Sequence, residues 1–140
     1  MKNYMIYTLG LFMLSLAIPS LARAQQNSNQ GIVAVGGETV LVLRAASSGM
    51  SIKQRVDAVQ ERLVTILSAP KLGMSDIVKQ PLKGNTYQIT VKGHLLVTVT
   101  TQDAAVNKTT TRKLADIWLE HLRKVLPQLN AKPNPNMENK

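Results

Sequence analysis

The stretch SIKQRVDAVQERLVTIL, residues 51–67, carries the strongest helix signal in the chain and decides the fold. Ser51 and Gln54 have the spacing of a capping box, in which a hydroxyl and an amide each satisfy a free backbone N–H group. Apolar residues then recur at spacings of three and four, which places them on one stripe of a helix. These residues are Ile52, Val56, Val59, Leu63, Ile66 and Leu67. Pro70 follows and ends the predicted amphipathic helix.

Two β-rich segments precede this helix. Ile32 to Val35 and Thr39 to Ala45 flank the pair Gly36-Gly37. Tight hairpin turns need the positive φ that glycine adopts readily. The sequence therefore predicts a β-hairpin ahead of the helix.

A strand and a second hairpin are predicted after the helix. Residues 77–82 form a strand that contains Pro81, which belongs at a sheet edge or a strand end because proline has no N–H group to donate. Residues 87–91 and 95–99 alternate in polarity around Gly93. Leu95, Val97 and Val99 are expected on the apolar face, opposite a face that is mostly threonine.

A second amphipathic helix is predicted near the end of the chain, with Thr110 as its N-cap. Its apolar stripe consists of Leu114, Ile117, Trp118, Leu122, Val125, Leu126 and Leu129. Pro127 argues that regular helix weakens near Leu126, since the proline ring clashes with the preceding turn. Residues 103–108, between the last strand and this helix, are expected to form a turn and a loop.

The order hairpin, helix, strand, hairpin, helix predicts an α+β fold. We expect two layers, with a largely antiparallel sheet made of two hairpins and one strand, and two amphipathic helices on one face of it.

The first 24 residues have the order of a secretory signal peptide. Lys2 supplies the positive start, residues 6–18 form an uncharged apolar run, and Ala22-Arg23-Ala24 gives the small-x-small pattern of a cleavage site. The apolar run is shorter than the roughly 20 residues that a membrane-spanning helix needs. We therefore expect cleavage between Ala24 and Gln25 and a periplasmic location.

This interpretation divides the chain into four parts. They are a signal peptide (1–24), a flexible leader (25–30), one α+β domain (31–129) and a tail (130–140) that is expected to be disordered, because it has two prolines and almost no apolar content.

The composition excludes several classes of protein. The 140 residues contain no cysteine, which excludes Cys nucleophiles, Cys-based zinc sites and iron–sulfur clusters. The formal net charge is +9, and Lys2 and Arg23 contribute two of these charges. An exported protein rarely meets nucleic acid, so nucleic acid is not expected as a partner. An anionic polymer or lipid surface of the cell envelope is the more plausible electrostatic partner.

The pattern of residues offers no catalytic, cofactor-binding or metal-ligating constellation. His94 falls at a predicted hairpin turn, and His121 lies at the edge of the second helix's stripe. Asp57 and Glu61 are four residues apart, but they lie on the polar face of the first helix with basic neighbours. No cofactor and no metal are therefore expected.

Asp103 and Trp118 are the two candidates for a structural role or a ligand contact. Asp103 ends a strand, where its carboxylate can accept backbone N–H groups and fix a turn. Trp118 is the only tryptophan and lies at a stripe position, where a core role is more common than a binding platform.

Three stretches resemble the extracytoplasmic domain that precedes the membrane part of some bacterial, especially cyanobacterial, small-conductance mechanosensitive channel proteins. They are SIKQRVDAVQERLVTIL (51–67), LLVTVTTQDA (95–104) and LADIWLEHLRKVL (114–126). Their most specific features are Val99, Thr100, Asp103 and Ala104 in the second stretch and Leu114, Ala115 and Trp118 in the third. The resemblance covers about 31–129 and implies a domain type and a compartment. Channel activity is not expected, because no apolar stretch follows Leu129.

These features favour a non-enzymatic, exported interaction or sensory module of the cell envelope, with an envelope protein as its partner. A binder of an anionic envelope polymer or lipid surface is the alternative. A small hydrolase-like enzyme is a second alternative.

Overall fold

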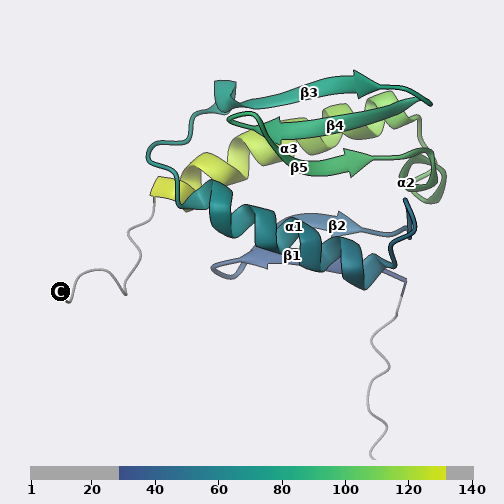
Figure 1. Cartoon of the computed structure of the whole chain (residues 1–140), viewed down its shortest axis with the longest axis horizontal. Coiled ribbons are helices and arrows are strands. Elements are labelled where there is room, and N and C mark those ends of the chain that lie inside the picture. The colour runs from purple at the N-terminus through teal and green to yellow at the C-terminus, as the bar shows by residue number, and fades with distance from the viewer. Residues whose placement is uncertain (1–28, 132–140) are drawn as a thin grey trace, which may run out of the picture.

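The structure is a computed structural model that describes residues 29–131, which form strands and helices (Figure 1). In chain order they are β1 (Gly31–Val35), β2 (Glu38–Leu43), α1 (Ile52–Leu67), the short 3-10 helix η1 (Met74–Asp76), β3 (Ile77–Leu82), β4 (Thr86–Val91), β5 (His94–Val99), α2 (Thr101–Val106) and α3 (Thr111–Ala131). The predicted signal peptide, the cleavage site at Ala24 and Gln25, most of the leader and the tail from 132 onward lie outside the described residues.

The α+β class and the antiparallel pairing of the strands are confirmed, but the strands form two sheets. The hairpin β1–β2 is one sheet, and β3, β4 and β5 form the other in that order. Pro81 lies in β3, an edge strand, as its missing N–H group predicts. Helix α1 contacts both β1 and β5, and so separates the hairpin from the larger sheet.

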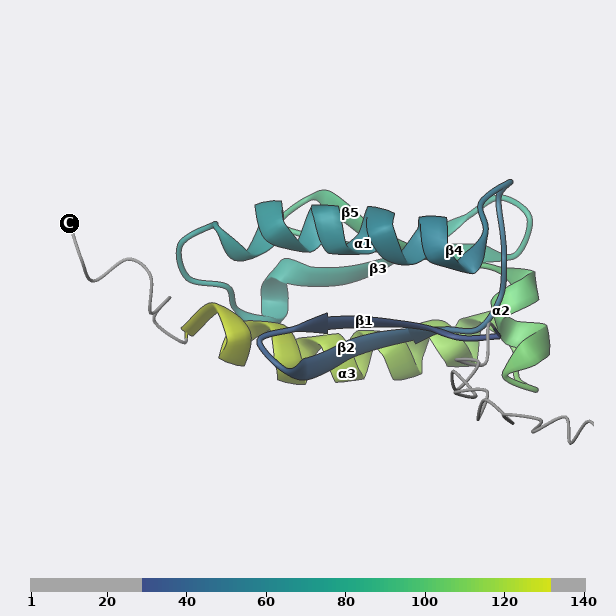
Figure 2. The same ribbon diagram turned by 90° about the horizontal axis from the view of Figure 1, so that it is seen from below.

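Each layer of the molecule contains one sheet and one long helix. In Figure 1 the three-stranded sheet and α1 lie in front, with α3 behind the sheet and the hairpin behind α1. Figure 2 shows the same two layers from below, one above the other. Helix α1 packs on β1, and α3 packs on β3 and β4. Each helix therefore covers the sheet of the opposite layer, and the core lies between them. It includes Val33, Leu43, Leu63, Ile77, Ile89, Val99, Leu122 and Leu126.

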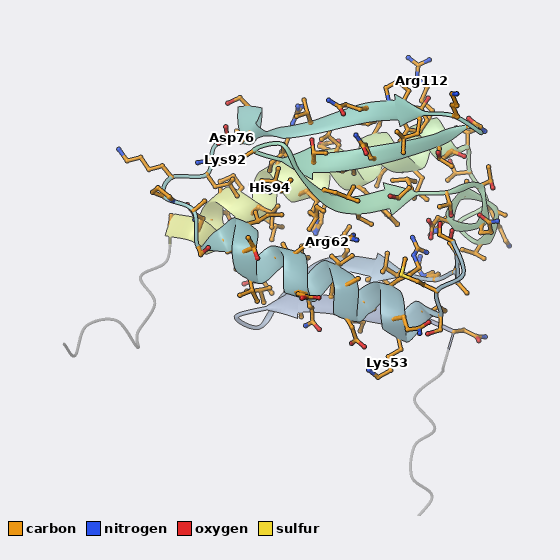
Figure 3. The ribbon with its side chains drawn as sticks, in the orientation of Figure 1. Lys53, Arg62, Asp76, Lys92, His94 and Arg112 are labelled. Carbon is orange, nitrogen blue, oxygen red and sulfur yellow. The ribbon has the colours of Figure 1, made fainter. Side chains whose placement is uncertain are left out.

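Two arginine side chains of α1 donate hydrogen bonds to carbonyl groups at the open edge of β5. The Arg62 guanidinium (Figure 3) donates to the Leu96 carbonyl at 3.1 Å. The Arg55 guanidinium donates to the Thr98 carbonyl at 3.1 Å. Arg55 and Arg62 are seven residues apart, or about two helical turns, so they lie on the same side of α1. An edge strand leaves such carbonyls unpaired, and α1 satisfies them.

The alternation predicted for the last strand is wrong at Leu95. Thr90 pairs with Leu95 and Ile89 pairs with Val97, so Leu96 is an additional residue in a β-bulge. The bulge shifts the register by one residue, which buries Leu96 completely and leaves Leu95 36% exposed.

Two further predictions fail around the last helix. The segment predicted as turn and loop contains α2, which begins after Thr100, where the Thr100 hydroxyl accepts from the Asp103 backbone N–H group. Helix α3 continues through Pro127 to Ala131. The predicted disordered tail is therefore wrong for Asn130 and Ala131, because packing against α1 and the 67–72 segment keeps the last turn in place.

Candidate functional site

A groove of about 620 Å³ lies between β2 and the first half of α3. We call it the basic groove. One wall is β2 and the residue after it, the other wall is α3, and the connection between α2 and α3 closes one end. Its lining consists of Thr39, Val40, Leu41, Val42, Arg44, Asn107, Lys108, Thr109, Lys113, Leu114, Ile117, Trp118 and His121.

The charges of this groove have one sign. Arg44, Lys108 and Lys113 line it, and none of the lining residues described is acidic. The Arg44 guanidinium donates to the Asn107 side-chain oxygen at 2.9 Å, which holds the cation at the closed end of the groove. No carboxylate neutralises these three cations within the groove, so it attracts anionic groups.

The two carboxylates of α3 are engaged with lysines that do not line the groove. Asp116 pairs with Lys79 of β3. Lys124 donates to Glu120 at 2.9 Å, and this hydrogen bond and the nearby positive charge lower the pKa of Glu120. Both carboxylates are therefore paired with lysines outside the groove.

Lys108 occupies a backbone position that usually belongs to glycine. Its φ is +51°, and it follows the end of α2, where the Thr109 N–H group donates back to the Ala104 carbonyl at 3.0 Å. This is the helix-ending motif in which a left-handed residue is most often glycine. A lysine in this conformation costs about 1 kcal/mol, yet here it supplies a charge at the closed end of the groove.

The β2 wall presents backbone groups that no strand uses. Among the described strands, β2 pairs only with β1. The Thr39 carbonyl points across the groove, where it accepts from the His121 Nε2–H group at 3.3 Å. In an antiparallel pair, the N–H and C=O groups of successive residues point alternately toward the partner strand and away from it. The register between β1 and β2 shifts by one residue between Val33 and Ala34. After Thr39, the next residue of β2 whose N–H and C=O groups point away from β1 is therefore Val42.

Trp118 lies in the floor of the groove, 8% exposed. No acceptor within the described residues bonds its indole N–H group. In the same part of the chain, no enclosed side-chain nitrogen or oxygen atom lacks a partner. Trp118 belongs to the core, as expected, and also faces the groove.

Asp103 is buried away from this groove. Its carboxylate accepts from Arg55 at 2.7 and 2.9 Å, and from the Thr100 backbone N–H group and hydroxyl at 3.0 and 2.9 Å. Asp103 accepts from the backbone, as predicted. The ion pair with Arg55 was not predicted, because the sequence pattern places Arg55 on the polar face of the first helix.

The other residues considered for chemistry are separate from one another. His94 begins β5 and is exposed, and Asp57 pairs with Lys53 on the exposed face of α1. Within residues 29–131, no group of three or more His, Asp or Glu side chains is placed to hold a metal ion. No helix in the same range is long and apolar enough to cross a membrane.

Sequence reasoning missed the groove because its cations come from three separate elements. Arg44 follows β2, Lys108 follows α2, and Lys113 lies in α3. The neighbouring Arg112 points away from the hairpin (Figure 3), so position in the sequence alone does not identify the groove residues. The positive φ of Lys108 is likewise invisible without the backbone.

A family model described as a domain of unknown function (DUF8459) matches residues 32–129. The chain belongs to this family. No curated protein and no solved structure matches it significantly. The matched range spans β1 to the last turn of α3, so the family corresponds to both layers of the described fold.

Proposed function

We propose that this DUF8459 protein is a non-catalytic binding module of the bacterial cell envelope and that the basic groove is its binding site. The observation that carries the proposal is the groove itself: three cations without a carboxylate, beside an unpaired strand edge and a tryptophan in the floor. This combination suits recognition of a partner that carries negative charge.

The chemistry of the groove favours binding over catalysis. Arg44, Lys108 and Lys113 are cations at neutral pH, and acid–base catalysis needs a group that takes up and releases protons. His121 is the one imidazole among the lining residues, and its Nε2–H group is held by the Thr39 carbonyl.

The start of the sequence supports a role outside the cytoplasm. Residues 1–24 have the order of a cleavable signal peptide. The resemblance to domains that precede mechanosensitive channels suggests an envelope membrane protein as the partner. The protein then acts as an accessory or sensory module of that partner.

Cell fractionation tests the export step. The mature protein, beginning at Gln25, is expected in the periplasmic fraction. Recovery of the full chain with Met1 from the cytosol contradicts export.

Site-specific crosslinking tests the groove. A photo-crosslinking amino acid replaces Ile117, which is 51% exposed in the groove, or, as a matched control, Val64, which is 74% exposed on α1. In intact cells of the source organism, we expect a reproducible adduct with one envelope protein from position 117 and none from position 64. The absence of an adduct, or identical adducts from both positions, contradicts the proposed site.

An anionic envelope polymer or lipid surface is the second candidate, favoured by the same three cations. The basic groove is a narrow feature with one strand edge, whereas a polymer or a lipid surface needs only charge. The strand edge therefore separates the two candidates.

A further inference from the structure

Resting on the proposed function, we propose that the partner's contact with the basic groove is an acidic peptide segment in extended conformation, which pairs with β2 as an additional strand. Peptides bind in this way where an exposed sheet edge supplies main-chain hydrogen bonds and flanking pockets select side chains. The groove offers the edge, the charge and the apolar contacts together.

The strand edge supplies the backbone partners. Val42 turns its N–H and C=O groups outward, and Thr39 does the same next to His121. Thr39 and Val42 are three residues apart, because Val40 is the additional residue of a bulge in β2. Both therefore face the same edge, where an extended peptide lying along β2 reaches them. Helix α3 then lies along its other side.

The charges select the composition of the peptide. Arg44, Lys108 and Lys113 gather at one end of the groove, while His121 lies at the other. Acidic side chains are therefore favoured at the end formed by the α2–α3 connection. The conformational cost of Lys108 is consistent with a charge that serves binding.

The apolar lining selects alternate side chains. Ile117 is 51% exposed on the α3 wall, Val42 is half-buried on the β2 wall, and Trp118 lies in the floor. In an extended peptide, every second side chain faces one way. A segment that alternates acidic with small apolar residues thus satisfies both the cations and this lining.

The chain itself is a poor occupant. Residues 132–140 contain two lysines, one glutamate and two prolines, so they lack both the acidity and the backbone donors that the groove needs. The net charge of +9, or +7 after removal of Lys2 and Arg23 with the signal peptide, also opposes association between two copies of the chain.

Amide hydrogen exchange measured by NMR tests the pairing. The probe is a short capped peptide in which glutamate alternates with valine or threonine. We expect it to slow exchange of the Thr39 and Val42 amides about tenfold or more at saturation, because these groups become hydrogen-bonded. Two versions of the peptide carry methyl groups on alternate backbone nitrogens, in the two possible patterns. The version that methylates the nitrogens facing β2 is expected to bind at least about tenfold more weakly than the other version.

Two variants test the charges. K108G/K113Q removes two groove cations, and glycine suits the left-handed backbone at position 108. K71G/K83Q is the matched control, because it also removes two lysines, replaces a left-handed lysine at Lys71 and leaves the groove intact. We expect a loss of affinity of about tenfold or more in the first variant and less than about threefold in the second.

Each outcome separates this inference from the proposed function. Binding of the peptide without slower exchange in β2, or equal affinity of both variants, overturns the inference. If anionic phospholipid vesicles bind through Lys108 and Lys113 and the peptide does not bind, the ligand of the groove is a lipid surface instead. If crosslinking at position 117 succeeds while the peptide fails, the binding module stands and the acidic strand is wrong.

Discussion

The Arg55 guanidinium connects four parts of the molecule at one point. It donates from α1 to the Ala45 carbonyl after β2 at 2.5 Å, to Thr98 in β5, and to Asp103 in α2. The two charged side chains are 6% and 0% exposed. A buried ion pair contributes little net stability compared with an apolar pair, but loss of one partner leaves an uncompensated buried charge.

Substitution of one partner is therefore expected to be costly. Asp103→Ala is expected to lower the free energy of unfolding by about 3–5 kcal/mol. In a double-mutant cycle with Arg55→Met, the sum of the losses in unfolding free energy of the two single variants is expected to exceed the loss in the double variant by about 1.5 kcal/mol or more. Urea unfolding monitored by circular dichroism measures all four proteins. Additive losses contradict the coupling.

Asn130 is a second residue whose side chain hydrogen-bonds to a distant part of the sequence. Its side-chain oxygen accepts from the Leu72 N–H group at 2.8 Å, and its side-chain nitrogen donates to the Leu67 and Ala69 carbonyls at 3.0 and 2.8 Å. One amide thus closes the end of α1 and the loop that follows it.

Asn130→Ala is expected to lower the free energy of unfolding by about 2 kcal/mol, since it removes three hydrogen bonds of about 0.5–1.5 kcal/mol each. Gln128→Ala is the control, because Gln128 is exposed in the same helical turn. Thermal unfolding of both variants checks the difference. Equal melting temperatures show that Asn130 has no such role.

These residue contacts mark a limit of sequence reasoning. The capping box at Ser51 and Gln54 was predicted and is present, since it needs only residues three apart. The contact of Arg55 with Asp103 joins residues 48 positions apart, and that of Asn130 with Leu72 joins residues 58 positions apart. Spacing along one helix carries no information about them.

The packing of α1 against the hairpin depends on a close approach at Gly31. A Cβ atom at this position would lie 2.4 Å from Val56 and 2.7 Å from Ile52, both side chains of α1. The missing side chain therefore sets how closely β1 and α1 pack.

Gly31→Ala is expected to lower the free energy of unfolding by about 1–3 kcal/mol, through overpacking. Gly73→Ala is the matched control, because its Cβ atom would meet only ordinary contacts at 3.6 Å or more. Chemical denaturation compares the two variants. A loss as large in the Gly73 variant argues against overpacking as the cause.

At the scale of elements, both long helices, both hairpins and the edge strand were predicted from periodicity and turn residues. Their division into two sheets was not, because it depends on α1 lying beside β5 through Arg55 and Arg62. The bulge at Leu96 and the helix through Pro127 were also missed. In each case, tertiary packing overrides the local pattern.

At the scale of the whole molecule, the two-layer arrangement creates the groove. Strand β2 and helix α3 share a layer, and β2 presents its open edge toward the helix. The excess of positive charge was visible in the composition, but its concentration at Arg44, Lys108 and Lys113 requires the folded chain.

The fluorescence of Trp118 tests binding in the groove most directly, because it is the only tryptophan and lies in the groove floor. Titration with the acidic peptide is expected to shift its emission saturably. The midpoint moves to higher peptide concentration as ionic strength rises from about 0.05 to 0.5 M, since salt screens exposed charges, and it moves likewise in K108G/K113Q but not in K71G/K83Q. Emission that does not change with peptide, or that changes equally in both variants, contradicts the assignment of the basic groove as the binding site.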